Sequence, residues 1–100
     1  MGLAEFQKKI ESIYFDKDQK RGLEGTFMWF LEEVGELTRD LRRGEDLSKL
    51  EEEFADVLAW LCSLASIKGV DMEKAVHRKY GQGCPYCHGN PCVCQESGSA

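Results

Sequence analysis

The stretch from Thr26 to Lys68 decides the fold, and it reads TFMWFLEEVGELTRDLRRGEDLSKLEEEFADVLAWLCSLASIK. Apolar residues recur every three or four positions on both sides of Gly44, which is the period of a helix that buries one face. The first set is Phe27, Phe30, Leu31, Val34, Leu37 and Leu41, and the second is Leu47, Leu50, Phe54, Val57, Leu58, Leu61, Leu64 and Ala65. Gly44 ends the first helix, and Asp46 is suited to cap the second. Because the turn is so short, we expect the two helices to pack antiparallel.

Two further helices are predicted on either side of this hairpin. The four expected helices run from about Leu3 to Asp16, Thr26 to Arg42 or Arg43, Leu47 to Lys68, and Met72 to Tyr80. Thr26 and Asp71 are the expected caps of the second and fourth helices, and the polar stretch Lys17 to Gly25 is the expected connector. Because signals for β-strands are scarce, the predicted class is all-α, a four-helix-bundle-like domain over residues 1–80.

Length and charge set limits on the function. One hundred residues suit one compact domain with a modest core, so oligomerisation is expected to help its stability. The net charge of -5 argues against a broad nucleic-acid or membrane surface, although a metal ion can still bridge an acidic site to a nucleotide. Without a membrane-spanning run or a signal-peptide pattern, a cytoplasmic location is expected. Cys62 stands alone in an apolar helix and is expected to pack in the core.

Acidic pairs mark both helices of the hairpin. Glu33 and Glu36 lie on the first helix, and Glu53 and Asp56 on the second, at a spacing that keeps each pair on one face. Counting back from the turn sets Glu36 level with Glu53, and Glu33 level with Asp56. Four carboxylates gathered there repel one another unless a divalent cation lies between them. The alternative is a plain solvated face, in which acidic residues near a helix N-terminus complement the helix dipole.

Two tryptophans extend this pattern. Trp29 comes one turn before Glu33, and Trp60 comes one turn after Asp56, so both lie on the acidic flank at the same end of the cluster. Aromatic rings beside carboxylates suit a site that stacks a base and binds a metal-bound phosphate. A subunit interface is the rival explanation for exposed tryptophans, and the two can coexist.

These motifs resemble those of the MazG-like, all-α nucleoside triphosphate pyrophosphohydrolases, a superfamily that includes dCTP pyrophosphatases and related dimeric dUTPases. The resemblance rests on Glu32-Glu33-Val34-Gly35-Glu36-Leu37, on Glu52-Glu53-Phe54-Ala55-Asp56-Val57-Leu58 and on Gly69-Val70-Asp71-Met72-Glu73-Lys74-Ala75-Val76. It covers the chain roughly from Phe6 to Tyr80.

The resemblance implies Mg²⁺-dependent hydrolysis of an NTP or dNTP to the monophosphate and pyrophosphate, in house-cleaning of the nucleotide pool, by a homodimer or homotetramer. Mn²⁺ is the alternative cation. By position, Glu33, Glu36, Glu53 and Asp56 would be the magnesium ligands, Glu32 and Glu33 the catalytic residues, and Trp29, Trp60 and Lys79 the substrate-binding residues. Glu32 would be a further ligand or would activate the attacking water.

One departure from the family concerns the end of the last helix. Many relatives continue it to a polar residue near the phosphates, whereas this chain breaks at Gly81-Gln82-Gly83. Contacts to the phosphates from that end are therefore in doubt. Other basic candidates are Lys17, Lys20, Arg21 and Arg78.

A cysteine-rich segment follows over residues 81–94, and a polar, flexible tail is expected over residues 95–100. Cys84, Cys87, Cys92 and Cys94 form the pattern C-x₂-C-x₄-C-x-C, which suits a structural Zn²⁺ with a closed coordination shell. His88 is an alternative ligand, and disulfides or an iron–sulfur cluster are the alternative chemistries. The rival to an enzyme is a helical and zinc-bound interaction or regulatory module with a degenerate nucleotide site.

Overall fold

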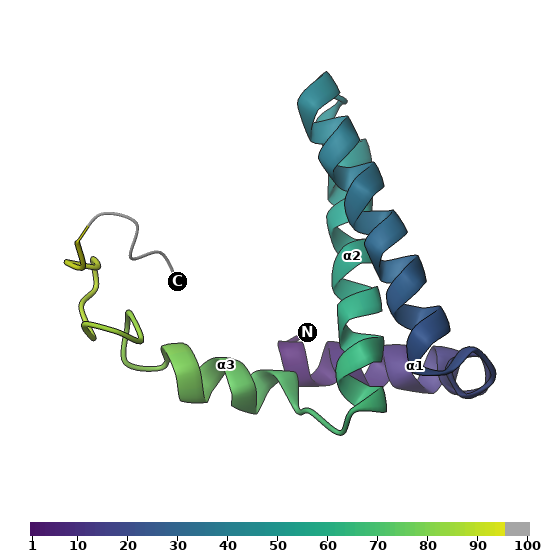
Figure 1. The fold of residues 1–100 in the computed structure, drawn as a ribbon, viewed down its shortest axis with the longest axis horizontal. Helices are drawn as coiled ribbons and strands as arrows, with labels where there is room; N and C mark the ends of the chain where they lie inside the picture. The colour runs from purple at the N-terminus through teal and green to yellow at the C-terminus, as the bar shows by residue number, and fades with distance from the viewer. Residues whose placement is uncertain (96–100) are drawn as a thin grey trace.

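The computed structural model describes residues 1–95, which form three helices and no strands. The helices are α1 (Leu3–Arg43), α2 (Leu47–Ile67) and α3 (Met72–Tyr80). The second half of α1 and the whole of α2 form a long antiparallel hairpin, while the first half of α1 crosses its base and α3 runs away from it (Figure 1). The predicted all-α class is confirmed, and so is the hairpin built from the stretch around Gly44.

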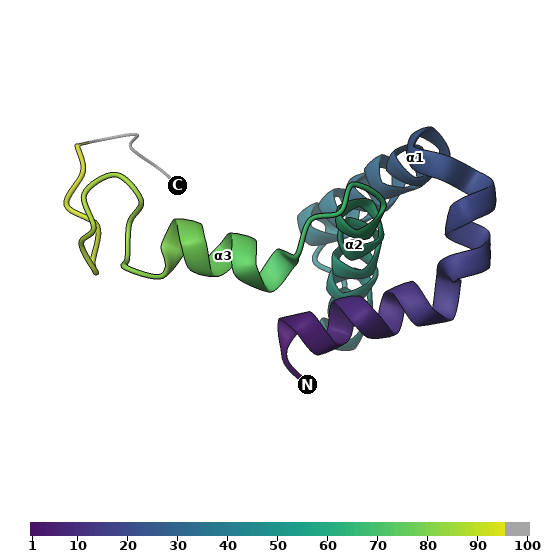
Figure 2. The same cartoon turned by 90° about the horizontal axis from the view of Figure 1, so that it is seen from below.

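The expected connector over residues 17–25 is wrong, because this stretch is helical except at one residue. Gly22 interrupts α1 with φ 72° and ψ -176°, a conformation that glycine adopts without steric strain. Thr26 is a fully buried residue inside the helix and not its cap; its hydroxyl donates to the Gly22 carbonyl at 2.7 Å. The flanking residues are polar but form helices well, and Asp18 accepts from Arg21 at 2.6 Å, three positions along. Figure 2 shows the resulting change of direction in α1.

The predicted helix ends at the hairpin turn and at the start of α3 are confirmed. Gly44 closes α1 in the left-handed conformation, at φ 72° and ψ 41°. Asp46 caps α2 by accepting from the Lys49 backbone at 2.9 Å, and Asp71 caps α3 by accepting from the Lys74 backbone at 3.0 Å. The turn therefore fixes which residues of α1 and α2 lie level with one another.

The core lies at the base of the hairpin, where the first half of α1 packs on α2. Cys62 is fully buried there, which confirms its predicted place in the core, and Ile10 and Ala65 are buried with it. Gln7 ties three parts of the chain together. Its amide nitrogen donates to Ser66 Oγ at 3.1 Å and to the Val70 carbonyl at 2.8 Å, and its Oε1 accepts from the Met72 backbone at 2.9 Å. These bonds hold the start of α3 against α1.

Many apolar side chains of the hairpin remain exposed. Leu31 and Leu41 on α1 are 61% and 50% exposed, and Phe54 on α2 is 54% exposed. Phe27, Leu47 and Leu58 are also among the exposed large apolar residues. Helical periodicity sets this apolar face on the side of the hairpin away from the acidic flank. The hairpin therefore has two faces of opposite character.

The C-terminal segment is a loop in which no residue between 81 and 95 is buried. It leaves the end of α3 far from the hairpin (Figure 1). Most of the flexible tail predicted from residue 95 onward lies outside the described residues. Over residues 1–95, none of the helices has the length and apolar content needed to cross a membrane.

Candidate functional site

The acidic flank is the face of the hairpin that carries Glu33, Glu36, Glu53 and Asp56. On this face, three other carboxylates act on Glu33. The pKa of Glu33 is raised by partial burial and then by the negative charges of Glu36, Asp56 and Glu32. Asp56 belongs to α2, so its effect shows that the acidic motifs of the two helices approach one another across the hairpin. A cation placed here would relieve this repulsion.

Glu53 meets a carboxylate that the sequence interpretation missed. It hydrogen-bonds with Asp40, which together with burial raises the pKa of Glu53 to about 7. The Arg39 guanidinium donates to Asp40 Oδ1 at 3.0 Å, and the pKa of Asp40 is lowered to about 2 as a result. Glu53 is thus paired with Asp40, and its predicted layer with Glu36 stays a prediction. Asp40 lies four residues after Glu36 and seven after Glu33, so the helical spacing already contained the signal.

One oxygen of Glu53 is free for a further partner. Glu53 Oε1 is buried and accepts no hydrogen bond from residues 1–95. A buried carboxylate oxygen without a partner costs free energy and is a good acceptor for a cation. The residues therefore fit a hard divalent ion in their chemistry. The oxygens of these carboxylates do not form a compact group. Within residues 1–95, the only compact group of three or more potential ligand residues is made of cysteines.

The two tryptophans stack on each other. The rings of Trp29 and Trp60 have centroids 6.1 Å apart and planes inclined by 12°. Trp29 is 48% exposed. The guanidinium of Arg21 lies over the Trp60 ring, 4.7 Å from its centroid. An exposed aromatic platform therefore adjoins the carboxylates.

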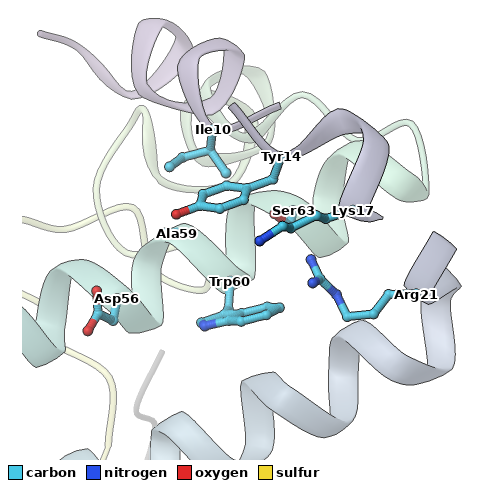
Figure 3. A pocket seen from close by; sticks show the side chains of 8 residues that line it. All are labelled: Ile10, Tyr14, Lys17, Arg21, Asp56, Ala59, Trp60 and Ser63. Atoms are coloured by element: carbon cyan, nitrogen blue, oxygen red, sulfur yellow. The ribbon is translucent and has the colours of Figure 1, made fainter. Parts of the chain in front are cut away.

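A cavity of about 230 Å³ opens beside this platform. Its lining joins both halves of α1 to α2 and consists of Ile10, Tyr14, Lys17, Arg21, Asp56, Ala59, Trp60 and Ser63. Figure 3 shows the ring of Tyr14 on one side and the indole of Trp60 on the other, with Asp56 at one end and Arg21 at the opposite end. Arg21 Nε is buried and finds no acceptor among residues 1–95. The cavity thus combines aromatic walls, two cations and one of the predicted metal ligands.

The sequence interpretation located this cavity only in part. Trp60, Asp56, Lys17 and Arg21 are among the candidates named from the sequence, whereas Tyr14 is not. Only the bend at Gly22 brings that helix over Trp60, and the bend itself was not predicted. Lys79 lies on α3, outside the cavity lining, with its Nζ 5.7 Å from the ring centroid of Tyr80.

The four cysteines of the C-terminal loop form a compact group that could hold a metal ion. Their Sγ atoms all lie within 4.8 Å of one another. Hydrogen bonds from the backbone of Val93 and Gly89 lower the pKa of Cys87 to about 6. Hydrogen bonding with Cys92 and Cys84 raises the pKa of Cys94 to about 12. The sulfurs therefore act on one another's pKa values, lowering that of Cys87 and raising that of Cys94.

Comparison with known proteins agrees with the hairpin and its acidic flank. The family model described as MazG nucleotide pyrophosphohydrolase domain matches residues 21–88, which include both acidic motifs, Trp29, Trp60 and the first two cysteines of the loop. No curated protein is found to match the chain. Because the family model covers more than half of the sequence and the all-helical fold agrees with it, the chain belongs to the MazG nucleotide pyrophosphohydrolase domain family.

Proposed function

We propose that the protein hydrolyses a nucleoside triphosphate, with ribose or deoxyribose, to the monophosphate and pyrophosphate in a Mg²⁺-dependent reaction. Membership of the family supports nucleotide pyrophosphohydrolysis as the reaction class. The observation that carries the proposal for this chain is the place of Asp56, which lines the aromatic cavity and also acts on the pKa of Glu33. A nucleotide held at this point would have its base and its phosphates on adjoining surfaces.

In this proposal Glu33, Glu36, Glu53 and Asp56 hold Mg²⁺, with Mn²⁺ as the alternative. The cation would supply charge neutralisation of the polyphosphate and a lowered pKa for water. Glu32 and Glu33 are the candidates for accepting the proton of the attacking water. The raised pKa of Glu33 suits a general base, because a base works best when its pKa approaches the ambient pH. Glu53 would give up its proton when the cation binds.

The cavity is of a size for the nucleoside part of the substrate. Pockets for drug-sized ligands usually span roughly 300–1,000 Å³, so a cavity of about 230 Å³ holds a base and sugar more readily than a whole nucleotide. Trp60 and Tyr14 offer aromatic faces for stacking. The unpaired Nε–H of Arg21 favours a base edge that carries a carbonyl oxygen. The phosphates would then extend over the acidic flank, whereas a contact from Lys79 requires that α3 or another subunit bring it there.

The test is the release of pyrophosphate from a panel of NTPs and dNTPs, with and without Mg²⁺. Hydrolysis in ¹⁸O-labelled water places the label in the monophosphate if the α-phosphorus is attacked. We expect Asp56→Asn to lower turnover at least tenfold, roughly the smallest loss seen when a metal site is disturbed. Glu52→Gln is the matched control, because it changes an exposed neighbouring carboxylate and should leave turnover intact. Release of orthophosphate, or equal activity of Asp56→Asn, would show that the proposed reaction is wrong.

We also propose that the exposed apolar face of the hairpin pairs with a second copy of the chain. Leu31, Leu41 and Phe54 are half-exposed or more on this face, although they repeat at helical spacing like core residues. A contiguous exposed apolar face of this kind marks an interaction surface, and the small size of the chain favours burying it against a second copy. Leu31→Glu and Phe54→Glu should shift sedimentation towards the monomer, whereas Tyr86→Glu on the distant loop should not. A wild-type protein that sediments as a monomer at high concentration would contradict this pairing.

The rival function is a regulatory or interaction module in which the nucleotide site no longer turns over. Its support is the stacking of Trp29 on Trp60, which leaves those faces of the rings closed to a base. Under this alternative, nucleotides bind without being hydrolysed. The same panel of NTPs and dNTPs distinguishes the enzyme from the regulatory module. Nucleotide binding measured by calorimetry, without any release of pyrophosphate, would favour the regulatory module. For either function the cytoplasm is the proposed location, where thiols stay reduced.

A further inference from the structure

We propose that Cys84, Cys87, Cys92 and Cys94 bind one Zn²⁺ through four thiolates, and that this ion takes the place of a hydrophobic core in folding the C-terminal loop. The Sγ atoms of Cys84 and Cys94 lie 3.6 Å apart, and those of Cys87 and Cys92 lie 3.9 Å apart. In a tetrahedral site with Zn–S bonds of about 2.3 Å, neighbouring sulfurs are about 3.8 Å apart. The two measured distances lie on either side of that value.

The same distances argue against disulfides. Two bonded sulfurs lie about 2.05 Å apart, well short of the spacing of either pair. All five cysteines of the chain are free thiols in this structure. A group in which all four sulfurs lie within 4.8 Å of one another also differs from two separate bridges, which would draw the sulfurs together in pairs only. The arrangement is one of four ligands around a common centre.

Backbone N–H groups point at the sulfurs. Tyr86 N donates to Cys84 Sγ at 3.4 Å, and Gly89 N and Val93 N both donate to Cys87 Sγ at 3.4 Å. Cys94 N donates to Cys92 Sγ at 3.3 Å. Neutral thiols are weak acceptors, whereas thiolates gain strongly from N–H donors. The loop therefore provides for negative charge on the sulfurs, which is the form that a metal ion binds.

The backbone of the loop closes around the sulfurs through glycines. A Cβ on Gly89 would lie 2.8 Å from the Pro91 carbonyl oxygen and 3.4 Å from Cys87 Sγ. Gly83 has φ 106°, and a Cβ there would lie 2.9 Å from the Gly89 carbonyl oxygen. Both positions need glycine so that the two halves of the loop can approach. This close approach brings Cys84 and Cys87 to the sulfurs of the second half.

The loop has no apolar core to hold this conformation. No residue from 81 to 95 is buried, and its large apolar side chains, Tyr86 and Val93, are 66% and 77% exposed. A segment without a core does not recover the entropy lost on ordering its backbone, and small loops of this kind fold when they bind a metal. The chain thus has a second folding unit whose stability comes from an ion.

The ligand set selects the ion and its role. Four thiolates at tetrahedral spacing suit Zn²⁺ or iron–sulfur chemistry, and they exclude the hard cations expected at the acidic flank. His88 is exposed and lies outside the four-sulfur group, so it is not a ligand. With four protein ligands no coordination position remains for water or substrate, which makes the centre structural.

The first experiment measures metal in the full chain after purification without chelators. We expect about one zinc per chain, and tetrahedral tetrathiolate absorption bands after exchange for Co²⁺. Cys87→Ser and Cys92→Ser should lower the zinc content at least about tenfold, while His88→Ala and the core variant Cys62→Ala should keep it. Three results would overturn the assignment. They are iron together with acid-labile sulfide, loss of zinc in His88→Ala, and disulfides that mass spectrometry still detects after purification under reducing conditions.

The second experiment tests the folding role. Amide spectra of the ¹⁵N-labelled chain should lose the dispersed signals of residues 84–94 when a chelator removes zinc, and regain them on adding Zn²⁺ alone. The signals of α1 and α2 should stay in place, because those helices have their own contacts. A loop that keeps its signals without metal would show that zinc does not fold it, and this outcome is independent of nucleotide hydrolysis.

Discussion

Asp40 of α1 and Glu53 of α2 interact across the hairpin: Asp40 raises the pKa of Glu53 to about 7, while Arg39 and then Glu53 lower the pKa of Asp40 to about 2. Arg39 and Lys49 flank the pair, with the Lys49 ammonium 3.9 Å from Asp40 Oδ2. The raised pKa favours a proton on Glu53, a residue that the family resemblance assigns as a metal ligand. The pair stabilises the closed end of the hairpin in the absence of a cation and sets a pH dependence.

In magnesium-free buffer, the free energy of unfolding should fall as the pH rises from about 4.5 to about 7. Glu53 has an ordinary pKa of 4.5 but keeps its proton to about pH 7 when folded, so the folded state binds more protons in this interval. Glu53→Gln should remove this fall, because its amide N–H can donate to Asp40 at every pH. Urea midpoints across the interval measure the effect. Glu52→Gln serves as the control, and a slope unchanged in Glu53→Gln would contradict the pairing.

Asp56→Asn should lower the pKa of Glu33. The charge of Asp56 is one of the causes that raise this pKa, so its removal brings the Glu33 carboxyl closer to its ordinary value of 4.5. Titration of the Glu33 side-chain carbon by NMR measures the change directly. Glu51→Gln, an exposed residue that is not among the causes, should leave the pKa of Glu33 where it is. If Asp56→Asn gives the wild-type titration curve, the two acidic motifs do not interact.

Trp60→Ala should raise KM for the preferred nucleotide by about tenfold or more, since stacking of a base on an aromatic ring contributes roughly 1–3 kcal/mol. Trp60→Phe should recover part of that loss because it keeps an aromatic face. Steady-state kinetics separate KM from kcat. Arg21→Gln is the companion variant, and its effect should differ between bases that carry a carbonyl oxygen and those that do not. Unchanged KM values in all three variants would show that the base does not bind in this cavity.

Gln7→Ala should destabilise the fold by about 1–3 kcal/mol, the usual cost of leaving buried polar groups without partners. Gln7 is buried, and its loss leaves the Met72 backbone N–H without its acceptor. Thermal unfolding measures the effect, and hydrogen exchange should show the largest increase at the start of α3. Lys8→Ala, the exposed neighbour, is expected to be near neutral. Equal melting temperatures for the two variants would show that Gln7 does not hold α3.

The sequence predicts the hairpin well because its signals are local. Gly44 and Asp46 fix the turn, and the turn fixes the level of Glu33 against Asp56. The pairing of Asp40 with Glu53 followed the same spacing but was missed, because an aspartate beside Arg39 looks like a surface ion pair. The bend at Gly22 could not be predicted in the same way. A glycine in a polar stretch suits a loop as well as a break within a helix, and only packing against α2 distinguishes the two.

The break at Gly22 also separates two groups of residues that line the cavity. Ile10, Tyr14 and Lys17 precede residue 21, where the match to the family begins, whereas Asp56 and Trp60 lie within it. One wall of the cavity therefore comes from residues before the family match, and the other comes from residues within it. If the cavity holds the base as proposed, substitutions at Ile10, Tyr14 or Lys17 should change which nucleoside fits and leave the carboxylates of the hairpin in place. The first half of α1 is then the part of the chain to vary when a different base preference is wanted.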